Sequence, residues 1–275
     1  LGPLCDVQDP EAVLQASQRC DELGIDTIST GGTIAFAMEC VERGFLDEPW
    51  LRFGDGAALL KAINLIGTGA GVGKLLRQGS RAMAAIVGHN SIEFAPQVKG
   101  LEIPGYEPRA LQTMALGFAV GTRGADHNRS GAYEIDFSDT ADRRKGTAAT
   151  ARLAVDTEDK AAIMDSLILC KFLRGVFIDY FAETAELLNL ITGWDLDQSA
   201  MQNMARGIID AKKEFNIRCG WTPVEDTLPQ RMLNSALQDD PEARLNTQTL
   251  QTMIAAYNLE RGWTADGYLD EMLSK

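Results

Sequence analysis

Apolar residues recur at intervals of three and four positions along most of this chain, which is the spacing that aligns side chains on one face of an α-helix. The first such stripe consists of Val13, Ala16, Cys20 and Leu23. Asp9 and Pro10 precede it as an N-cap and a first helical residue, and Gly24 follows it as a stop. The same pattern predicts further helices over residues 30–44, 55–66, 157–173, 185–191, 199–215, 247–259 and 267–273.

The alternation of apolar and polar residues that is typical of strands is scarce. Ala85–Val87 and Ile92–Phe94 are the best candidates, and both are short. No repeating succession of strand and helix occurs, which disfavours a doubly wound sheet or a barrel. We therefore predict an all-α, multihelical fold. The segment from Gly88 to Arg109 is rich in Gly and Pro, and it divides the chain into two predicted helical subdomains, residues 1–96 and 97–275.

Charge and composition narrow the possible partners. Acidic residues outnumber basic ones by 39 to 26 in 275 residues, which gives a formal net charge of −13. Such a chain repels polyphosphates, so we expect no nucleic-acid partner. No apolar run reaches the length of about 18 residues that a membrane span needs, and we expect no membrane partner. The five cysteines are widely spaced without a CxxC pair, which favours a reduced, cytoplasmic chain over a disulfide scaffold.

Common catalytic and phosphate-binding motifs are incomplete in this sequence. The stretch from Gly67 to Lys74 suggests a phosphate-binding loop, but Thr68 and Leu75 stand where the Walker pattern needs a glycine and a hydroxyl residue. We interpret this stretch as a connection between helices. The two histidines belong to no zinc-ligand pair, and no GxSxG nucleophile motif occurs.

Two heptapeptides in this chain resemble each other: Asp21–Thr27 and Asp165–Lys171. Each begins with an aspartate, has glycine or isoleucine at its fourth position and an aliphatic residue at its fifth, and continues with aspartate or cysteine. This pattern resembles the paired DxxGL(C/D) signature of the tungsten-containing aldehyde ferredoxin oxidoreductase family. Further segments resemble that family in the same order along the chain: Lys99–Glu102, Gly105–Arg109, Arg123–His127, Phe215–Asn216 and Arg261–Trp263.

The resemblance implies a tungsten cofactor carried by two pterins of the molybdopterin type. Two neighbouring N–H donors on a pterin edge can donate to one carboxylate, which explains why an aspartate opens each heptapeptide. In the second copy, Ile168 stands where the family has glycine. The implied cofactor-binding residues are Asp21, Gly24, Ile25, Asp26 and Thr27 in the first copy, and Asp165, Leu169, Cys170 and Lys171 in the second.

The resemblance implies two further roles. Cys170 takes the position of a thiolate ligand to a [4Fe–4S] cluster and is thereby the implied metal ligand. Its apolar neighbours in the sequence alone favour a buried, inert cysteine instead. His127 takes the position of a catalytic histidine near the metal, where an imidazole can orient the aldehyde carbonyl or move a proton.

The implied activity is the oxidation of an aldehyde to a carboxylate, with electrons passing through the cluster to ferredoxin. The family's CxxCxxxC cluster motif and its N-terminal pterin-binding domain do not occur in this sequence, which begins with Leu1. We therefore expect the C-terminal part of a longer enzyme, which by itself binds neither tungsten nor cluster. Two alternatives stay open: a tungsten–pterin subunit that reduces aromatic thioesters, and a helical scaffold that has lost catalysis.

Overall fold

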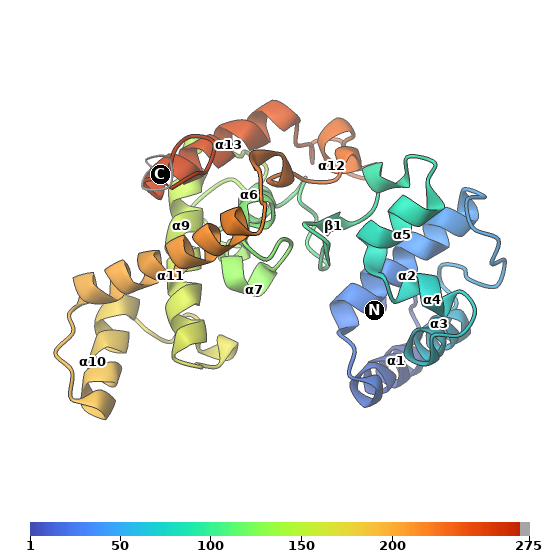
Figure 1. Cartoon of the computed structure of the whole chain (residues 1–275), viewed down its shortest axis with the longest axis horizontal. Coiled ribbons are helices and arrows are strands. Elements are labelled where there is room, and N and C mark those ends of the chain that lie inside the picture. Colours follow the sequence, from blue (N-terminus) through green and yellow to red (C-terminus); the bar gives the residue numbers. More distant parts are fainter. Residues whose placement is uncertain (270–275) are drawn as a thin grey trace. The chain divides into compact units, whose positions relative to one another are not determined.

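The computed structural model describes residues 1–269, and within that range the chain consists of helices, connecting loops and one two-stranded hairpin (Figure 1). The predicted all-α fold is confirmed. The chain forms two compact units. The first comprises Leu1–Glu107, Arg123–Asp126 and Thr227–Arg244, and the second comprises Pro108–Thr122, His127–Asp226 and the chain from Leu245 onward. The subdomain boundary at residues 96 and 97 stays a prediction.

The first unit packs its helices around one apolar core. Its most buried side chains include those of Phe36, Met38, Leu59 and Ile63. Its helical elements are η1 (Pro3–Cys5), α1 (Pro10–Leu23), α2 (Thr27–Glu42), α3 (Gly56–Thr68), α4 (Gly73–Leu76), α5 (Gly79–Val87), η2 (Ser91–Glu93) and α12 (Gln230–Asn234). Strands β1 (Gln97–Val98) and β2 (Leu101–Glu102) form its antiparallel hairpin.

Local sequence signals place the starts of α1 and α3 in this unit correctly. The Asp9 carboxylate accepts a hydrogen bond from the backbone N–H of Glu11 at 3.0 Å, and α1 begins at Pro10 as predicted. Asp55 caps α3 in the same way. The stretch interpreted as a connection does join two helices, because Gly69 ends α3 in a left-handed conformation and α4 comes directly afterwards.

A buried carboxylate fastens the hairpin to two helices. Glu102 is 3% exposed, and its Oε1 accepts hydrogen bonds from the backbone N–H and the hydroxyl of Ser80, at 2.7 and 2.8 Å. The Thr33 hydroxyl donates a third, at 3.2 Å. Since a buried charge needs such donors, Glu102 ties β2 to the start of α5 and to α2.

The second unit is organised around helix α9, which contacts α6, α7, α11 and α13. Figure 1 shows α9 running through the middle of this unit. Its helical elements are α6 (Gln112–Val120), α7 (His127–Ser130), α8 (Tyr133–Asp136), α9 (Ala148–Ser166), η3 (Lys171–Leu173), α10 (Tyr180–Thr192), α11 (Gln198–Arg218), η4 (Pro223–Glu225) and α13 (Thr247–Glu260).

An ionic cluster holds α13 against α9. The Arg261 side chain is 1% exposed, and it contacts Glu158 at 2.6 Å and Asp159 at 2.5 Å. The Tyr257 hydroxyl donates to Glu158 and accepts from Arg261. Burial raises the pKa of the Asp159 carboxyl, and Arg261 opposes that effect. Because each charge has a partner, the cluster fixes how α13 lies on α9.

Two sequence-based predictions of secondary structure are wrong. Ala85–Val87 is the last turn of α5, and Ile92–Phe94 belongs to a 3-10 turn and the residue after it. Short apolar runs do not distinguish a strand from a helix segment, and no strand partner lies opposite either run in the part of the chain that the structure describes. The strands are instead the two residues on each side of Lys99–Gly100.

The predicted helix over residues 157–173 is also wrong at both ends. Helix α9 begins nine residues earlier, at Ala148, behind a capping box formed by Thr147 and Thr150. It ends at Ser166, because Ile168 adopts a left-handed conformation with φ of 56° that no helix can continue through. Most of the helix predicted over residues 267–273 lies outside the described residues.

Candidate functional site

The second heptapeptide ends helix α9 in a Schellman turn. The backbone N–H of Ile168 donates to the Asp165 carbonyl at 3.2 Å, and that of Leu169 donates to the Met164 carbonyl at 2.9 Å. This pair of bonds closes the last helical turn around a residue with positive φ. The turn leaves the Asp165 side chain at the C-terminal end of the helix and directs the chain onward to Cys170.

The first heptapeptide has the same local structure at the end of α1. The backbone N–H of Gly24 donates to the Asp21 carbonyl at 3.1 Å, and that of Ile25 donates to the Cys20 carbonyl at 3.0 Å. Gly24 has φ of 66°. The two copies therefore agree bond for bond, although they lie in different units.

The sixth residue of each copy precedes a new helical turn. In the first copy this is Asp26, whose carboxylate accepts from the backbone N–H of Ser29 at 2.7 Å and caps α2, with Thr27 as the first helical residue. In the second copy it is Cys170, which precedes η3 with extended backbone and no side-chain cap. The thiol of Cys170 is therefore not committed to capping, whereas the carboxylate of Asp26 is.

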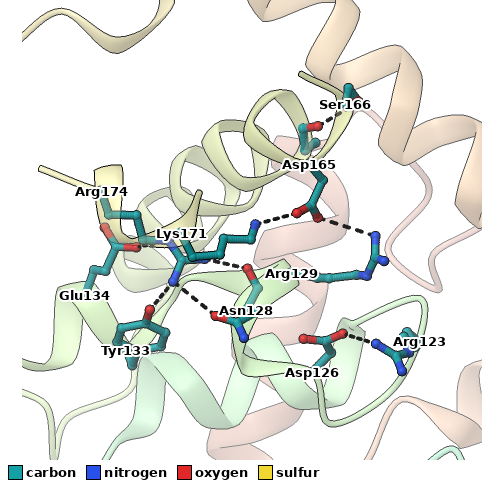
Figure 2. Close-up of polar contacts among 11 residues, drawn as sticks. Arg123, Asp126, Asn128, Arg129, Tyr133, Glu134, Asp165, Ser166, Lys171 and Arg174 are labelled. Carbon is teal, nitrogen blue, oxygen red and sulfur yellow. Dashed lines mark hydrogen bonds and ion pairs between the residues drawn. The ribbon is translucent and has the colours of Figure 1, made fainter. Parts of the chain in front are cut away.

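The Asp165 carboxylate lies between two cations from different segments (Figure 2). The Lys171 Nζ is 2.5 Å from Asp165 Oδ1, and a terminal guanidinium nitrogen of Arg129 is 3.4 Å from Oδ2. The side chains of Asp165 and Lys171 are about one quarter exposed. Asp165 is thus a half-buried anion at a helix end, where the helix dipole disfavours negative charge and the cations offset it.

A third cation, Arg174, ties the loop that carries Cys170 to the segment that begins with His127. The Arg174 guanidinium donates to the Asn128 carbonyl at 2.6 Å and to the Tyr133 hydroxyl, and it pairs with Glu134 at 3.0 Å (Figure 2). Three partners for one planar guanidinium fix its orientation. Arg174 lies four residues after Cys170, so this network sets where the loop meets α7 and α8.

His127 is the first residue of α7, beside the residues that this network contacts. Its ring is 6.1 Å from that of Tyr133, centre to centre, at a tilt of 42°. Arg129, two residues further along α7, reaches Asp165. The structure thus brings three predicted site residues, His127, Asp165 and Lys171, onto neighbouring segments of the second unit.

The surroundings of Asp165 shift the titration of two nearby groups. Burial lowers the pKa of the Lys212 ammonium on α11, and the positive charge of Arg129 lowers it further. Burial also raises the pKa of the Tyr180 hydroxyl to about 12, with a contribution from the negative charge of Asp165. The region is therefore one of partly desolvated, interacting charges, which is typical of functional sites but also of structural ion-pair networks.

The cysteines separate into two groups by exposure. Cys5, Cys20 and Cys40 are buried, and burial raises the pKa of the Cys40 thiol to about 12. Cys170 and Cys219 are exposed, so the alternative of a buried, inert Cys170 is wrong. Among the described residues, no group of three or more His, Cys, Asp or Glu side chains is arranged to hold a metal ion.

The remaining predicted residues lie in the first unit. Asp21 and Asp26 are exposed, and a side chain at Gly24 would meet no atom within 4 Å. Open space of this kind allows a ligand to approach the backbone closely. Arg123, in the segment that resembles the family, pairs with Asp126 at 2.8 Å (Figure 2).

Sequence reasoning missed Arg129, Arg174 and their partners. Both arginines carried a detectable signal, because Arg129 follows His127 by two residues and Arg174 follows Cys170 by four. Tyr133 and Asn128 carried none, because hydroxyl and amide side chains acquire their partners only when α9 folds against α7.

The donor set fits a pterin better than it fits an iron–sulfur cluster. A carboxylate flanked by Lys and Arg can accept pterin N–H donors while the cations face pterin phosphates. A [4Fe–4S] cluster needs four thiolates, and among the described residues no group of three or more ligand side chains is arranged to hold a metal ion around Cys170. The described residues therefore do not by themselves complete a cluster site around Cys170.

Comparison with known proteins establishes the family. The family model described as "Aldehyde ferredoxin oxidoreductase, domains 2 & 3" matches residues 1–275. The chain belongs to the aldehyde ferredoxin oxidoreductase family, a family of oxidoreductases. It is 34% identical over 284 residues to the tungsten-containing aldehyde ferredoxin oxidoreductase of Pyrococcus furiosus and 32% identical to that of Thermococcus kodakarensis. Each alignment covers 97% of this chain and 45% of the relative, so the chain spans less than half the length of these enzymes.

One more distant relative and one solved structure also match this chain. A protein of Pyrococcus furiosus called "Aliphatic sulfonate oxidoreductase, WOR-like subunit" is 29% identical over 206 residues, covering 71% of this chain and 30% of that protein. This chain also matches a chain in the solved structure titled "Active site complex BamBC of Benzoyl Coenzyme A reductase in complex with 1,5 Dienoyl-CoA". The match covers 95% of this chain and 45% of the chain in that structure, with a TM-score of 0.72 and 19% sequence identity. That likeness supports the fold.

Proposed function

We propose that this chain is the C-terminal part of a tungsten–pterin oxidoreductase that converts aldehydes to carboxylates. The observation that supports it most is the matching geometry of the two heptapeptides, each of which sets an aspartate at a helix end before a Schellman turn. One carboxylate for each of two pterins is the arrangement that the paired motif implies. Membership of the family supplies the tungsten and the redox chemistry.

Each residue of the second copy has a proposed task. Asp165 accepts hydrogen bonds from one pterin edge, and Lys171 and Arg129, which now pair with that carboxylate, face the anionic part of the cofactor. Leu169 packs beside the turn. Cys170 provides one thiolate to a [4Fe–4S] cluster whose other ligands belong to polypeptide outside this sequence.

In the first copy, Asp21 accepts hydrogen bonds from the other pterin, and Gly24 permits close approach of the ring. Ile25, Asp26 and Thr27 shape the adjoining surface. Because Asp26 already caps α2, its proposed contact to the cofactor uses a lone pair that the cap leaves available.

His127 acts on the substrate. Oxidation of an aldehyde and water to a carboxylate releases two electrons and three protons, and the bound tungsten group supplies the redox chemistry. The His127 imidazole donates an N–H to the aldehyde oxygen, which polarises the carbonyl, or accepts a proton from the attacking water. Arg174 and Tyr133 hold the segments around it in place.

The proposal extends to partners and location. When bound, the cluster would supply electron transfer to a ferredoxin, and an N-terminal domain of the same protein would complete the cofactor site, as expected for a chain that spans 45% of the length of its relatives. A cytoplasmic location agrees with five free cysteines. The described part of the chain has no helix with the length and apolarity to cross a bilayer.

A second candidate function is that of a subunit in a larger complex that acts on thioesters or sulfonates. The distant relative and the structural neighbour favour it, since one is named as a subunit and the other is titled an active-site complex. Substrate choice depends on pocket shape rather than on the cofactor-binding turns, so both functions share the residue roles above.

Purification from the complete coding sequence tests the proposal. We expect tungsten, pterin and about four irons per chain, and reduction of a viologen dye with aliphatic or aromatic aldehydes. Turnover of aromatic coenzyme A thioesters or sulfonates without aldehyde turnover would support the second function. A protein without tungsten and pterin would support the helical scaffold.

A further inference from the structure

Helix α10 carries apolar side chains on two sides. On one face, Phe181 and Ala185 pack with Met201 and Ala205 of α11 in a small separate core. Figure 1 shows α10 beside the first turns of α11. The large exposed apolar residues on the rest of α10 do not belong to this core.

The second apolar side of α10 is exposed. Leu187, Leu190 and Ile191 are 40%, 77% and 81% exposed, and Trp194, two residues beyond the helix, is 56% exposed. Residues three and four apart lie on one side of a helix, so the first three form one stripe. We call these four residues the outer face of α10. A helix with apolar residues on two sides normally has both sides covered, and grouped exposed apolar residues mark interaction sites.

The charged residues that lie near the outer face in the sequence are all acidic. No Lys or Arg occurs between Arg174 and Arg206 in the sequence. The same stretch contains five acidic residues: Asp179, Glu183, Glu186, Asp195 and Asp197. A shallow hollow adjoins the outer face, where Leu190 and Leu196 provide apolar walls and Glu186 and Asp197 provide carboxylates. Among the residues that the structure describes, no Lys or Arg lines this hollow.

We propose that the outer face of α10 is a docking surface for a protein partner whose apolar contact residues are surrounded by Lys and Arg. Complementary charge favours such a partner, because an acidic partner would place like charges opposite the acidic residues around the stripe. For the same reason a second copy of this chain is disfavoured, since two copies would oppose their acidic rims. The apolar stripe supplies affinity, and the rim supplies orientation and selectivity.

The test uses the chain as it is, with a synthetic amphipathic helix as the probe. The Leu/Lys peptide carries leucines on one face and lysines on the other, and a matched Leu/Glu peptide has glutamate at every lysine position. Binding is followed by calorimetry and by the change in total tryptophan fluorescence, to which Trp194 in the outer face contributes with the three other tryptophans. The variant L190Q/I191Q removes the stripe but keeps every charge. L14Q is the matched control, because it makes the same kind of change at Leu14 of α1, which is 67% exposed.

We expect the Leu/Lys peptide to bind the chain and L14Q equally, to bind L190Q/I191Q at least about tenfold more weakly, and to lose affinity in 0.5 M salt. We expect the Leu/Glu peptide not to bind. Equal binding to L190Q/I191Q would overturn the proposal, as would equal binding of both peptides by the unaltered chain. A dimer in light scattering that L190Q/I191Q dissociates would overturn it in favour of a second copy. Circular dichroism checks the fold of the variants, and the two-peptide comparison needs no variant.

Discussion

Gly24 and Ile168 occupy the same left-handed backbone conformation, with φ of 66° and 56°, at the fourth position of two heptapeptides in different units. Glycine adopts this conformation without steric strain, whereas a β-branched residue is destabilised by about 1–2 kcal/mol. The Ile168 side chain is 91% exposed, so burial does not offset that strain. The second turn is therefore held in a strained form by its Schellman bonds and by the contacts of the loop after it.

Replacing Ile168 with glycine should therefore stabilise the chain by about 1 kcal/mol, because it removes strain and no buried contact. Gly24→Ala should destabilise it by about 1 kcal/mol, although a methyl group there meets no other atom. Gly207→Ala, in the exposed middle of α11, is the control and should stabilise by about 0.5–1 kcal/mol. Urea unfolding measures all three. A destabilised Ile168→Gly variant would show that the backbone of the folded chain is not strained at Ile168.

The buried ion cluster between α9 and α13 should be intolerant of partial removal. Arg261→Met leaves Glu158 and Asp159 buried without their cation, and we expect a loss of about 3–5 kcal/mol in the free energy of unfolding. Arg218→Met removes an exposed pair with Glu214 at the end of α11 and should change stability by less than about 1 kcal/mol. Similar losses in both variants would contradict the assignment of the cluster.

Buried thiols should make the chain less stable in alkali. Burial raises the pKa of the Cys40 thiol from 9.0 to about 12 and that of Cys5 from 9.0 to about 11. Above pH 9 the unfolded chain releases these protons and the folded chain retains them, so stability that is fully present below pH 9 falls as the pH rises toward the folded values.

Urea unfolding between pH 8 and pH 11 measures this loss. Cys40 alone should contribute a slope of about 1.4 kcal/mol per pH unit above pH 9, and Cys40→Ala should remove that share of the slope. Cys219→Ala, at an exposed thiol, is the control and should leave the slope unchanged. Identical slopes for the Cys40→Ala variant and the unaltered chain would contradict the prediction.

Arg174 should restrain the loop that carries Cys170. In a Cys219→Ala background, a nitroxide label on Cys170 should show a sharper, more mobile spectrum when Arg174 is replaced by alanine, because the loop loses its bonds to Asn128 and Tyr133. Arg174→Lys, which keeps the charge but not the planar fork, should restore part of the restraint. Arg152→Ala, at an 81% exposed arginine on α9, should have no effect. Unchanged spectra in Arg174→Ala would show that the loop is held by other contacts.

The sequence predicted helices best where capping residues are explicit. Asp9, Asp55 and Gly24 define ends that depend on bonds within a few residues, and the structure confirms them. The end of α9 could not be predicted in this way, because an isoleucine normally continues a helix and nothing local announces its left-handed conformation. Stability gained elsewhere in the fold overrides the local preference there.

The candidate site shows the same division between features that depend on neighbouring residues and features that depend on the whole fold. The aspartates, Cys170 and His127 were identified through motifs of adjacent residues. The arginine network was not, because Arg174 meets Asn128 and Tyr133 across more than 40 positions of sequence, and Arg129 meets Asp165 across 36. Such partners are brought together by the packing of α7 and α8 on α9, which no local pattern encodes.

The cofactor content of an Asp165→Asn variant of the complete protein tests the central claim most directly. The amide keeps the shape of the side chain but presents a donor to a pterin donor, and a lost charge-assisted bond costs about 1.5–3 kcal/mol. Asp156→Asn, at an exposed aspartate of the same helix that pairs with Lys160, is the matched control. We predict that tungsten and pterin per chain fall severalfold or more in Asp165→Asn and stay unchanged in Asp156→Asn. Equal tungsten and pterin in both variants would contradict the assignment of Asp165 as a pterin-binding residue.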